Sequence, residues 1–349
     1  MALDRGRAVC GEEQMDGSGH AVVEAGPGRA PEGARPGRHR RLIPPPFLWK
    51  RGVGAVIAVW GVLTAVFVLL NISGNPAVLL LPVGAPASEV AHLSQSLGYN
   101  DPLIVQYLLF LGRTLTGHFP NSLEYGTPAL GVVFGHVGAT LELVASALVL
   151  AVIGGMVSGY VGAFGRYGWL RTAAVASAVV MQSIPVFILG VFLVLVFSLR
   201  WSILPASGDA GIQALILPAV TLSGPVYAPI ARIFRTTLLE VAEEPHVRTA
   251  VAKGISLRSV RWRHVMGNAL LPVITVVGLQ AGTLLGGTVI VETVFAWPGI
   301  GQLAILAVNS RDYPVILADT LVISLGFVVA NFAVDILYMF LDPRVRQRV

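Results

Sequence analysis

The sequence is poor in the residues that build catalytic centres. Its single cysteine, Cys10, excludes a disulfide or a thiolate metal site within one chain. The seven histidines are scattered, and none has the spacing of a zinc-binding pair. No glycine-rich segment ends in Gly-Lys-Ser or Gly-Lys-Thr, so the loop that cradles nucleotide phosphates is missing. We therefore expect a chain that is not an enzyme and holds no cofactor, and any ATP used must be bound by another subunit.

Charge is also scarce, and apolar residues are abundant. Charged residues make up 12% of the 349 residues, hydrophobic residues make up 54%, and the mean hydropathy is +0.73. An ordinary soluble domain cannot bury so much apolar surface, so lipid must solvate it. A membrane-spanning helix needs about 20 apolar residues. The sequence therefore predicts an all-α polytopic membrane protein with six spanning helices, at 53–72, 132–163, 169–199, 212–234, 267–291 and 315–341.

The basic residues predict the orientation of these spans, because Lys and Arg are retained in cytoplasmic loops. One side of the six-span arrangement carries 21 of the 24 Lys and Arg residues. The other side carries only Arg113, Arg200 and Arg311. Both termini are therefore expected in the cytoplasm. The net charge of +5 follows from this topology and does not indicate nucleic-acid binding.

The chain divides by composition into four segments. Residues 1–50 are rich in Gly, Pro, Arg and Ala from Ala25 to Pro46, and we expect a disordered cytoplasmic tail. Arginines near its end offer anionic lipid contact as a second interpretation of this tail. These arginines are Arg35, Arg38, Arg40 and Arg41. Residues 51–131 hold the first span and an external helical loop, residues 132–341 hold the core transmembrane domain, and residues 342–349 form a cytoplasmic tail.

The external loop contains two helix signals. Ser88 is a good cap for a short helix that ends at Gly98, and Asp101-Pro102 is a strong start for a helix that reaches Thr116. The second helix has an apolar stripe but is too short to span a membrane. It is expected to lie at the interface or to pack on the helix bundle.

The long basic loop at 240–265 is the most informative segment. Thr249–Lys253 favours a helix, Gly254 suits the left-handed position that ends one, and Ser256 is a good cap for the next. The pattern predicts a helix–glycine–helix hairpin on the cytoplasmic side. Pro272, at the entry to the following apolar run, predicts a helix start or a kink.

This segment resembles the coupling loop of permease subunits of bacterial ABC importers, in particular the dipeptide, oligopeptide and nickel family. The shared pattern is RTA-x-A-KG, a basic stretch with His, NALLP and then ETVF-x-x-PG-x-G. Arg248 and Thr249 stand where the wider superfamily has Glu and Ala, which is the variant typical of this family. The matching residues are Arg248, Thr249, Ala250, Ala252, Lys253, Gly254, His264, Asn268 to Pro272, Glu292 to Phe295, Pro298, Gly299 and Gly301.

The resemblance implies a type I ABC importer permease in the bacterial cytoplasmic membrane, working by alternating access. The implied partners are a second homologous permease, two cytosolic ATPases that bind ATP and Mg²⁺, and an external solute-binding lipoprotein. The residues implied to couple to the ATPases are Glu244, Arg248, Thr249, Ala250, Ala252, Lys253, Gly254 and Ser256. Those implied to form an external gate loop are Glu292, Phe295, Trp297, Pro298, Gly299 and Gly301, with an ordinary connector as the alternative. Peptides, nickel complexes, opines and glycosides all remain possible cargo.

A self-contained secondary transporter or channel is the alternative function. Such a protein would be expected to show inverted repeats and paired coupling-ion residues, and the sequence has no clear internal repeat. A carrier of that kind also has no need for a helix–glycine–helix docking surface. An intramembrane protease is a third class, but the sequence lacks a matching aspartate pair or zinc motif.

Two features within the spans have more than one interpretation. Glu142, Asp319 and Asp335 fall in or near spans, where a charge is costly, and they either contact cargo or form structural hydrogen bonds. A group of prolines and a glycine in the fourth span predicts either a broken helix along the pathway or a kinked helix that packs. These residues are Pro218, Gly224, Pro225 and Pro229.

Overall fold

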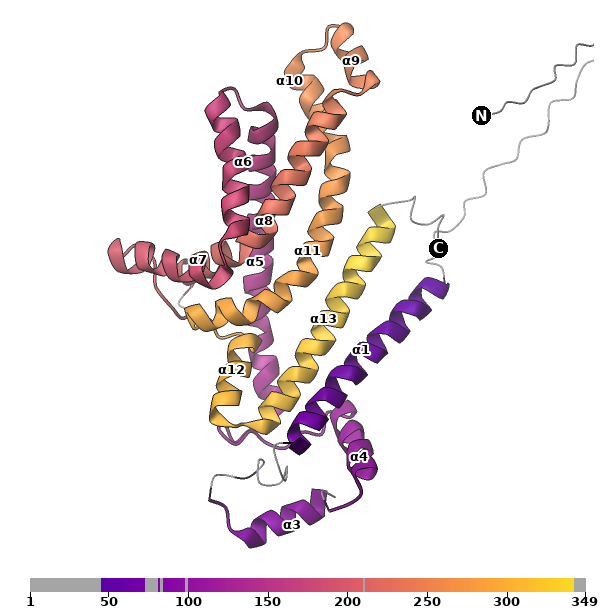
Figure 1. The fold of residues 1–349 in the computed structure, drawn as a ribbon, viewed down its shortest axis with the longest axis vertical. Helices are drawn as coiled ribbons and strands as arrows, with labels where there is room; N and C mark the ends of the chain where they lie inside the picture. The colour runs from indigo at the N-terminus through magenta and orange to yellow at the C-terminus, as the bar shows by residue number, and fades with distance from the viewer. Residues whose placement is uncertain (1–44, 73–80, 82–83, 98–99, 210, 342–349) are drawn as a thin grey trace, which may run out of the picture. The chain divides into compact units, whose positions relative to one another are not determined.

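A computed structural model describes residues 45–72, 81, 84–97, 100–209 and 211–341, and the expected tails at 1–44 and 342–349 lie outside the described residues (Figure 1). The described part is almost entirely helical. Its only strand-like pairing is an isolated bridge between Asn121 and Pro128. The expectation of an all-α fold is confirmed.

The longest helices match the expected spans closely. They are α1 (Pro45–Ile72), α5 (Ala129–Phe164), α8 (Ile212–Ala242), α11 (Met266–Phe295) and α13 (Tyr313–Leu341). Shorter α-helices and two π-helical segments complete the described chain. These are α3 (Ala87–Leu97), α4 (Leu103–Leu115), α6 (Gly168–Ser183), α7 (Val186–Leu193), η1 (Val194–Arg200), α9 (Pro245–Ala252), α10 (Leu257–Val260), η2 (Arg261–Val265) and α12 (Ile300–Ser310).

The expected third span is not a straight helix. The described residues contain five helical stretches long and apolar enough to cross a membrane, or up to seven if each of two bent pairs counts as one span. One bent pair is α6 with α7 and η1, which turn by 108°. Pro185 explains the bend, because proline forces the preceding residue out of the helical region, and Ile184 is extended at φ −88° and ψ 122°.

The centre of the core is the packing of α5 on α8. Two glycines of α5 let the helices approach closely: a Cβ at Gly155 would lie 2.7 Å from Cγ2 of Ile230, and one at Gly159 would lie 2.8 Å from the Ala231 carbonyl oxygen. Helix α6 joins them through a 2.6 Å hydrogen bond between the hydroxyls of Ser177 and Tyr227. These three helices form the framework from which the cytoplasmic hairpin extends (Figure 1).

Helix α8 corrects the expectation of a broken fourth span. It runs without interruption from Ile212 to Ala242, although Pro218, Pro225 and Pro229 lie inside it. Pro218 and Gly224 are buried against neighbouring helices. The missing hydrogen bonds are therefore tolerated within a packed helix, which agrees with the alternative interpretation of these prolines as packing devices.

The first helix begins earlier than its apolar run. Helix α1 starts at Pro45, so the boundary of the expected tail at residue 50 is wrong. Proline is compatible with the first turn of a helix, because the amide that it lacks has no partner there. Helix α1 lies beside α13, and helix α4 packs on α1 (Figure 1). The Tyr107 and Thr64 hydroxyls share a 2.6 Å hydrogen bond, and Phe67 contacts both Tyr107 and Phe110.

Candidate functional site

The loop between α8 and α11 forms the expected helix–glycine–helix hairpin. Helix α9 begins at Pro245 and ends in a Schellman motif around Gly254. The Gly254 N–H donates to the Val251 carbonyl at 2.9 Å, and the Ile255 N–H donates to the Ala250 carbonyl at 3.3 Å. Gly254 has φ +80°, which confirms its left-handed conformation. This geometry reverses the chain between the two short helices.

The second half of the hairpin is held by a cap and by aromatic contacts. The Ser256 hydroxyl accepts a 3.4 Å hydrogen bond from the Ser259 N–H, as expected of the cap of α10. In the π-helical segment η2, the Arg261 guanidinium lies 4.7 Å from the centre of the Phe164 ring. Trp262 packs near Tyr160, with ring centres 6.1 Å apart. The hairpin is thus attached to the C-terminal end of α5, the central helix of the core.

The two faces of the hairpin differ in character. Val247 and Ala250 are buried against the rest of the chain, at 4% and 7% exposure. The outer face of the hairpin, which is its solvent-exposed surface, carries Val251, Ile255 and Leu257 together with basic side chains. Of the residues implied to couple, Ala250 therefore faces inward, and seven face outward. The exposed seven are Glu244, Arg248, Thr249, Ala252, Lys253, Gly254 and Ser256.

Two of the exposed polar residues are already engaged within the hairpin. Glu244 lies 3.0 Å from the ring nitrogen Nδ1 of His246. The Thr249 hydroxyl donates to the Pro245 carbonyl at 2.9 Å. Lys253, by contrast, is exposed at the tip beside the apolar residues of the outer face. An exposed apolar patch with a polar rim is typical of a protein interaction surface.

The second candidate site is the turn that joins α11 to α12. The final part of α11, Gly286–Phe295, and α12 meet at 71°, which gives the segment a re-entrant shape. Ala296 takes the left-handed conformation at φ 47°. The Trp297 N–H donates to the Glu292 carbonyl at 2.9 Å, and the Trp297 ring N–H donates to the Ala139 carbonyl of α5 at 2.8 Å. Trp297 is only 3% exposed, so it anchors the turn.

The side chain of Glu292 organises the turn from inside. It is fully buried, and its Oε1 accepts a 2.7 Å hydrogen bond from the Thr140 hydroxyl of α5. Its Oε2 accepts a 3.0 Å bond from the Gln302 N–H of α12. Thr140 in turn accepts a 2.9 Å bond from the Ile300 N–H. One carboxyl group thus joins α5, α11 and the start of α12.

Both glycines of the turn make room for this carboxyl group. A Cβ at Gly299 would lie 2.3 Å from Cδ of Glu292. A Cβ at Gly301 would lie 2.6 Å from Cα of Val289 and 2.9 Å from Oε2 of Glu292. Gly299 has φ −100°, so it is steric room and not backbone conformation that requires glycine here. Phe295 is buried at 1% exposure, and Pro298 is half-buried.

Comparison with known families identifies the family to which the chain belongs. A model described as binding-protein-dependent transport system inner membrane component matches residues 151–347. Its companion, the N-terminal part of such membrane components, matches residues 46–153. The chain belongs to this family of permeases.

Individual relatives agree with the family. The chain is 37% identical over 303 residues to the glutathione transport system permease protein GsiC of Escherichia coli (strain K12), covering 86% of this chain and 99% of the relative. It shows the same identity and coverage with GsiC of Shigella flexneri serotype 5b (strain 8401). The chain is therefore a permease subunit of an ABC importer and a multi-pass protein of the bacterial inner membrane. An importer of this family works with ATPase and solute-binding subunits.

Two solved structures are also similar. An inward-facing MetNI methionine ABC transporter aligns with a TM-score of 0.49 and 20% identity, covering 62% of this chain and 98% of that chain. An amino acid ABC transporter with histidines aligns with a TM-score of 0.46 and 16% identity, covering 60% and 92%.

The acidic residues in the spans of this permease have different surroundings. Glu142 is exposed on α5, where Leu141 and Val149 are exposed as well. Asp319 of α13 is buried at 1% exposure and lies close enough to Glu292 for electrostatic interaction. Its Oδ1 has no hydrogen-bond partner among the described residues. The side chain of Asp335 lies outside the described part of the chain.

Sequence analysis missed a second long-range polar contact. Asp312 is buried, and its Oδ2 accepts hydrogen bonds from the Ser122 hydroxyl and from the Glu124 N–H at 3.2 Å. Its Oδ1 accepts from the Val315 N–H at 3.3 Å, so Asp312 also caps α13. The cap could have been found in the sequence, because Asp precedes an apolar helix with Pro314 in its first turn. The contact with Ser122, 190 residues away, has no sequence signal.

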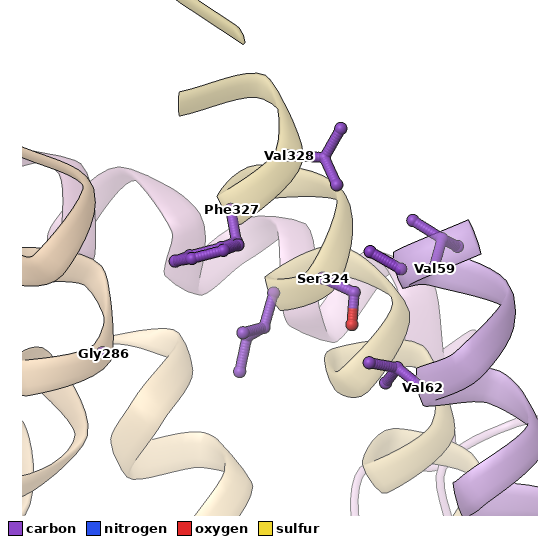
Figure 2. A pocket seen from close by; sticks show the side chains of 8 residues that line it. Val59, Val62, Gly286, Ser324, Phe327 and Val328 are labelled. Carbon is purple, nitrogen blue, oxygen red and sulfur yellow. The ribbon is translucent and has the colours of Figure 1, made fainter. Parts of the chain in front are cut away.

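A pocket of about 210 Å³ lies between α1, α11 and α13 (Figure 2). Val59 and Val62 of α1 line it, opposite Ser324 and Phe327 of α13 and beside Gly286 of α11. The Ser324 hydroxyl donates to the Thr320 carbonyl at 2.7 Å. The lining offers no charged group, so this pocket has no chemistry with which to select a polar cargo.

Proposed function

We propose that this permease forms half of a solute pathway and transmits ATP-driven motion through the hairpin at Pro245–Val265. A second homologous permease would complete the pathway. Two cytosolic ATPases would bind ATP and Mg²⁺, and each would receive one hairpin. An external solute-binding lipoprotein would deliver the cargo. The orientation with both termini in the cytoplasm rests on the distribution of basic residues.

The observation that carries this proposal is the construction of the hairpin. Its outer face combines exposed Val251, Ile255 and Leu257 with Lys253 and Arg258, which suits docking in a protein cleft. Its inner face is attached to α5 through the stacking of η2 on the end of that helix. A push on the tip would therefore reach the core as a rigid-body movement, which is what alternating access requires.

The experiment uses Gly254→Val in the assembled complex, reconstituted in vesicles with its ATPase and binding-protein partners. A β-branched residue is strained at φ +80° by about 1 kcal/mol or more, although a Cβ there would meet no atom within 4 Å. We expect loss of transport and of receptor-stimulated ATP hydrolysis, with normal insertion in the membrane. Gly267→Val is the matched control, because Gly267 lies in the first turn of α11 with ordinary φ and equally open space. Normal transport by Gly254→Val would overturn the proposed coupling role.

For the cargo we propose a small peptide or a solute of similar charge. The relatives at 37% identity are named for glutathione, which is a tripeptide carrying one ammonium group. Glu142 is the residue of this chain that suits an ammonium, because it is a single acidic side chain on an exposed face of α5. A charge facing lipid at mid-membrane costs about 2.5–3.5 kcal/mol, which favours a water-filled pathway for that face. Loss of uptake of peptides with a free amino terminus, but not of the same peptides acetylated at that terminus, in Glu142→Gln would support this assignment, and equal uptake of both would contradict it.

The alternative function is that of a self-contained transporter, and it is tested with the purified chain alone. The purified chain without partners should hydrolyse no ATP above background, because its sequence has no phosphate-binding loop. Solute accumulation by the isolated chain in ATP-free vesicles would favour the alternative.

A further inference from the structure

A second cavity, of about 190 Å³, lies between α5, α6 and α8. Its walls combine small apolar side chains with two hydroxyl groups and two arginines. The residues that matter for its chemistry are Ser158, Ala174, Val175, Arg232, Arg235 and Thr236. None of the residues that line the cavity is acidic. The cavity is therefore positively charged on one side and apolar on the other.

The two arginines have different partners. The Arg235 Nε donates a 3.1 Å hydrogen bond to the Gly162 carbonyl, which fixes this guanidinium against α5. Arg232 is exposed and forms neither an ion pair nor a hydrogen bond with any described residue. The three helices around the cavity contain only Glu142 and Glu240 as acidic residues, and neither lines it. The positive charge of the cavity is thus not neutralised by the described chain.

The depth of the cavity matches the headgroup region of a membrane leaflet. Ser158 lies six residues before the end of α5 at Phe164, and Ala174 lies six residues after the start of α6 at Gly168. At 1.5 Å per residue, the cavity lies about 9 Å below the loop that joins these helices. By the distribution of basic residues that loop is cytoplasmic. A guanidinium at this depth can meet a lipid phosphate while apolar surface continues toward the membrane interior.

The surface next to the cavity is suited to an acyl chain. Val175 and Val179 follow each other by one turn on α6 and are 37% and 53% exposed. Arg171 precedes Val175 by one turn, so a third arginine lies on the same face nearer the cytoplasm. A ligand with one phosphate and an apolar tail would satisfy both parts of this surface.

We propose that this cavity binds the phosphate group of an anionic phospholipid from the cytoplasmic leaflet, with Arg232 and Arg235 as its ligands. Basic pockets between spanning helices on the cytoplasmic side are suited to such headgroups. The bound lipid stabilises the packing of α6 on α5 and α8. The residues that line the cavity include neither Glu142 nor any residue of the hairpin, so the site is independent of the proposed cargo and coupling sites.

The test is lipid retention by the full-length chain with its co-purifying subunits, measured by native mass spectrometry. The probes are phosphatidylglycerol, phosphatidylcholine and inorganic phosphate. We expect phosphatidylglycerol to be retained and Arg232→Gln to lower its retention about five-fold, the equivalent of about 1 kcal/mol for one arginine at an anionic surface. Arg263→Gln, an exposed arginine of η2 with the same charge change, should have no effect.

A second variant separates charge from shape. Val175→Phe fills the cavity and leaves both arginines in place, so it should reduce phosphatidylglycerol retention as well. Equal loss in Arg263→Gln would overturn the proposal in favour of general surface charge. Equal retention of phosphatidylcholine would show that the cavity does not select an anionic lipid. Displacement of the lipid by millimolar inorganic phosphate would overturn the lipid assignment and leave a soluble anion as the ligand. Unchanged retention of phosphatidylglycerol in both Arg232→Gln and Val175→Phe would show that the cavity does not bind the lipid.

Discussion

The hairpin at Pro245–Val265 and the turn between α11 and α12 both depend on glycine, but for opposite physical reasons. Gly254 has an unusual backbone conformation, φ +80°, in open space where a Cβ would meet nothing within 4 Å. Gly299 has an ordinary φ of −100° in a space so tight that a Cβ would lie 2.3 Å from the Glu292 carboxyl carbon. The hairpin therefore requires glycine for its backbone conformation, whereas the turn requires glycine because there is no room for a side chain.

The difference follows from what each region contacts. The hairpin is built from contacts between residues close in sequence, such as the two hydrogen bonds that close its Schellman motif. The turn is built around a carboxyl group whose partner Thr140 is 152 residues away. A hairpin of local contacts can move as a unit at the end of α5. The turn is part of the packed core, so it can move only together with α5 and α12.

The largest effect is expected from Glu292→Ala. The substitution leaves the buried Thr140 hydroxyl and the Gln302 N–H without their acceptor, and each buried unsatisfied group costs about 1–3 kcal/mol. A cavity adds to this cost. We expect a loss of about 3 kcal/mol or more, seen as a lower midpoint of thermal unfolding in detergent. Glu292→Gln keeps an acceptor and should lose less. Equal midpoints for Glu292→Ala and the unmodified chain would show that the turn does not depend on the carboxyl group.

The next largest effect is expected from filling the tight space. Gly299→Ala and Gly301→Ala should each cost about 1–3 kcal/mol, which is typical of an overpacked core. Combining each glycine variant with Glu292→Ala distinguishes the two positions. The three atoms nearest to a Cβ at Gly299 all belong to the Glu292 side chain, so the double variant should lose less stability than the sum of the two single variants. The overlap at Gly301 includes Cα of Val289 and should persist. Additive losses in both combinations would contradict the steric explanation.

Local features of the sequence predicted the hairpin well. Gly254 and Ser256 act through bonds to residues within five positions, so the order of residue types is enough to place them. The spans were also predictable, because a helix in lipid must be continuously apolar. The resemblance to permeases predicted the family correctly.

Features that depend on distant residues were not predicted. Three prolines suggested that α8 is broken, but burial between α5 and α11 keeps it helical. The 108° bend at Pro185 interrupts an apolar run that hydropathy treats as one span. The hydrogen-bond partners of Glu292 and Asp312 depend on how α5, α12 and α13 pack together. No local sequence pattern predicts that packing.

A smaller effect on stability, but a specific one on coupling, is expected from graded substitution of Gly254. Gly254→Asn should be nearly neutral, because Asn tolerates the left-handed conformation, whereas Gly254→Ala should cost about 1 kcal/mol within the hairpin. Neither residue meets a steric clash there, so the midpoint of global unfolding should hardly change. The ratio of solute transported to ATP hydrolysed should fall in the order Gly, Asn, Ala. If Asn and Ala have equal effects, backbone conformation is not what requires glycine at this position.

The smallest effect is expected from Ser256→Ala, which removes the cap of α10. Loss of an N-cap costs about 0.5–2 kcal/mol, and the 3.4 Å bond to the Ser259 N–H places this cap at the lower end. Because α10 has only four residues before η2, the loss should fray the first turn and leave the stacking of η2 on α5 intact. Hydrogen exchange should therefore quicken at the Ser259 amide by a few-fold and remain unchanged at Val265. Ser259→Ala, which keeps the capping hydroxyl, is the control. Faster exchange throughout η2 in Ser256→Ala would mean that the cap, and not the aromatic stacking, holds the hairpin against the core.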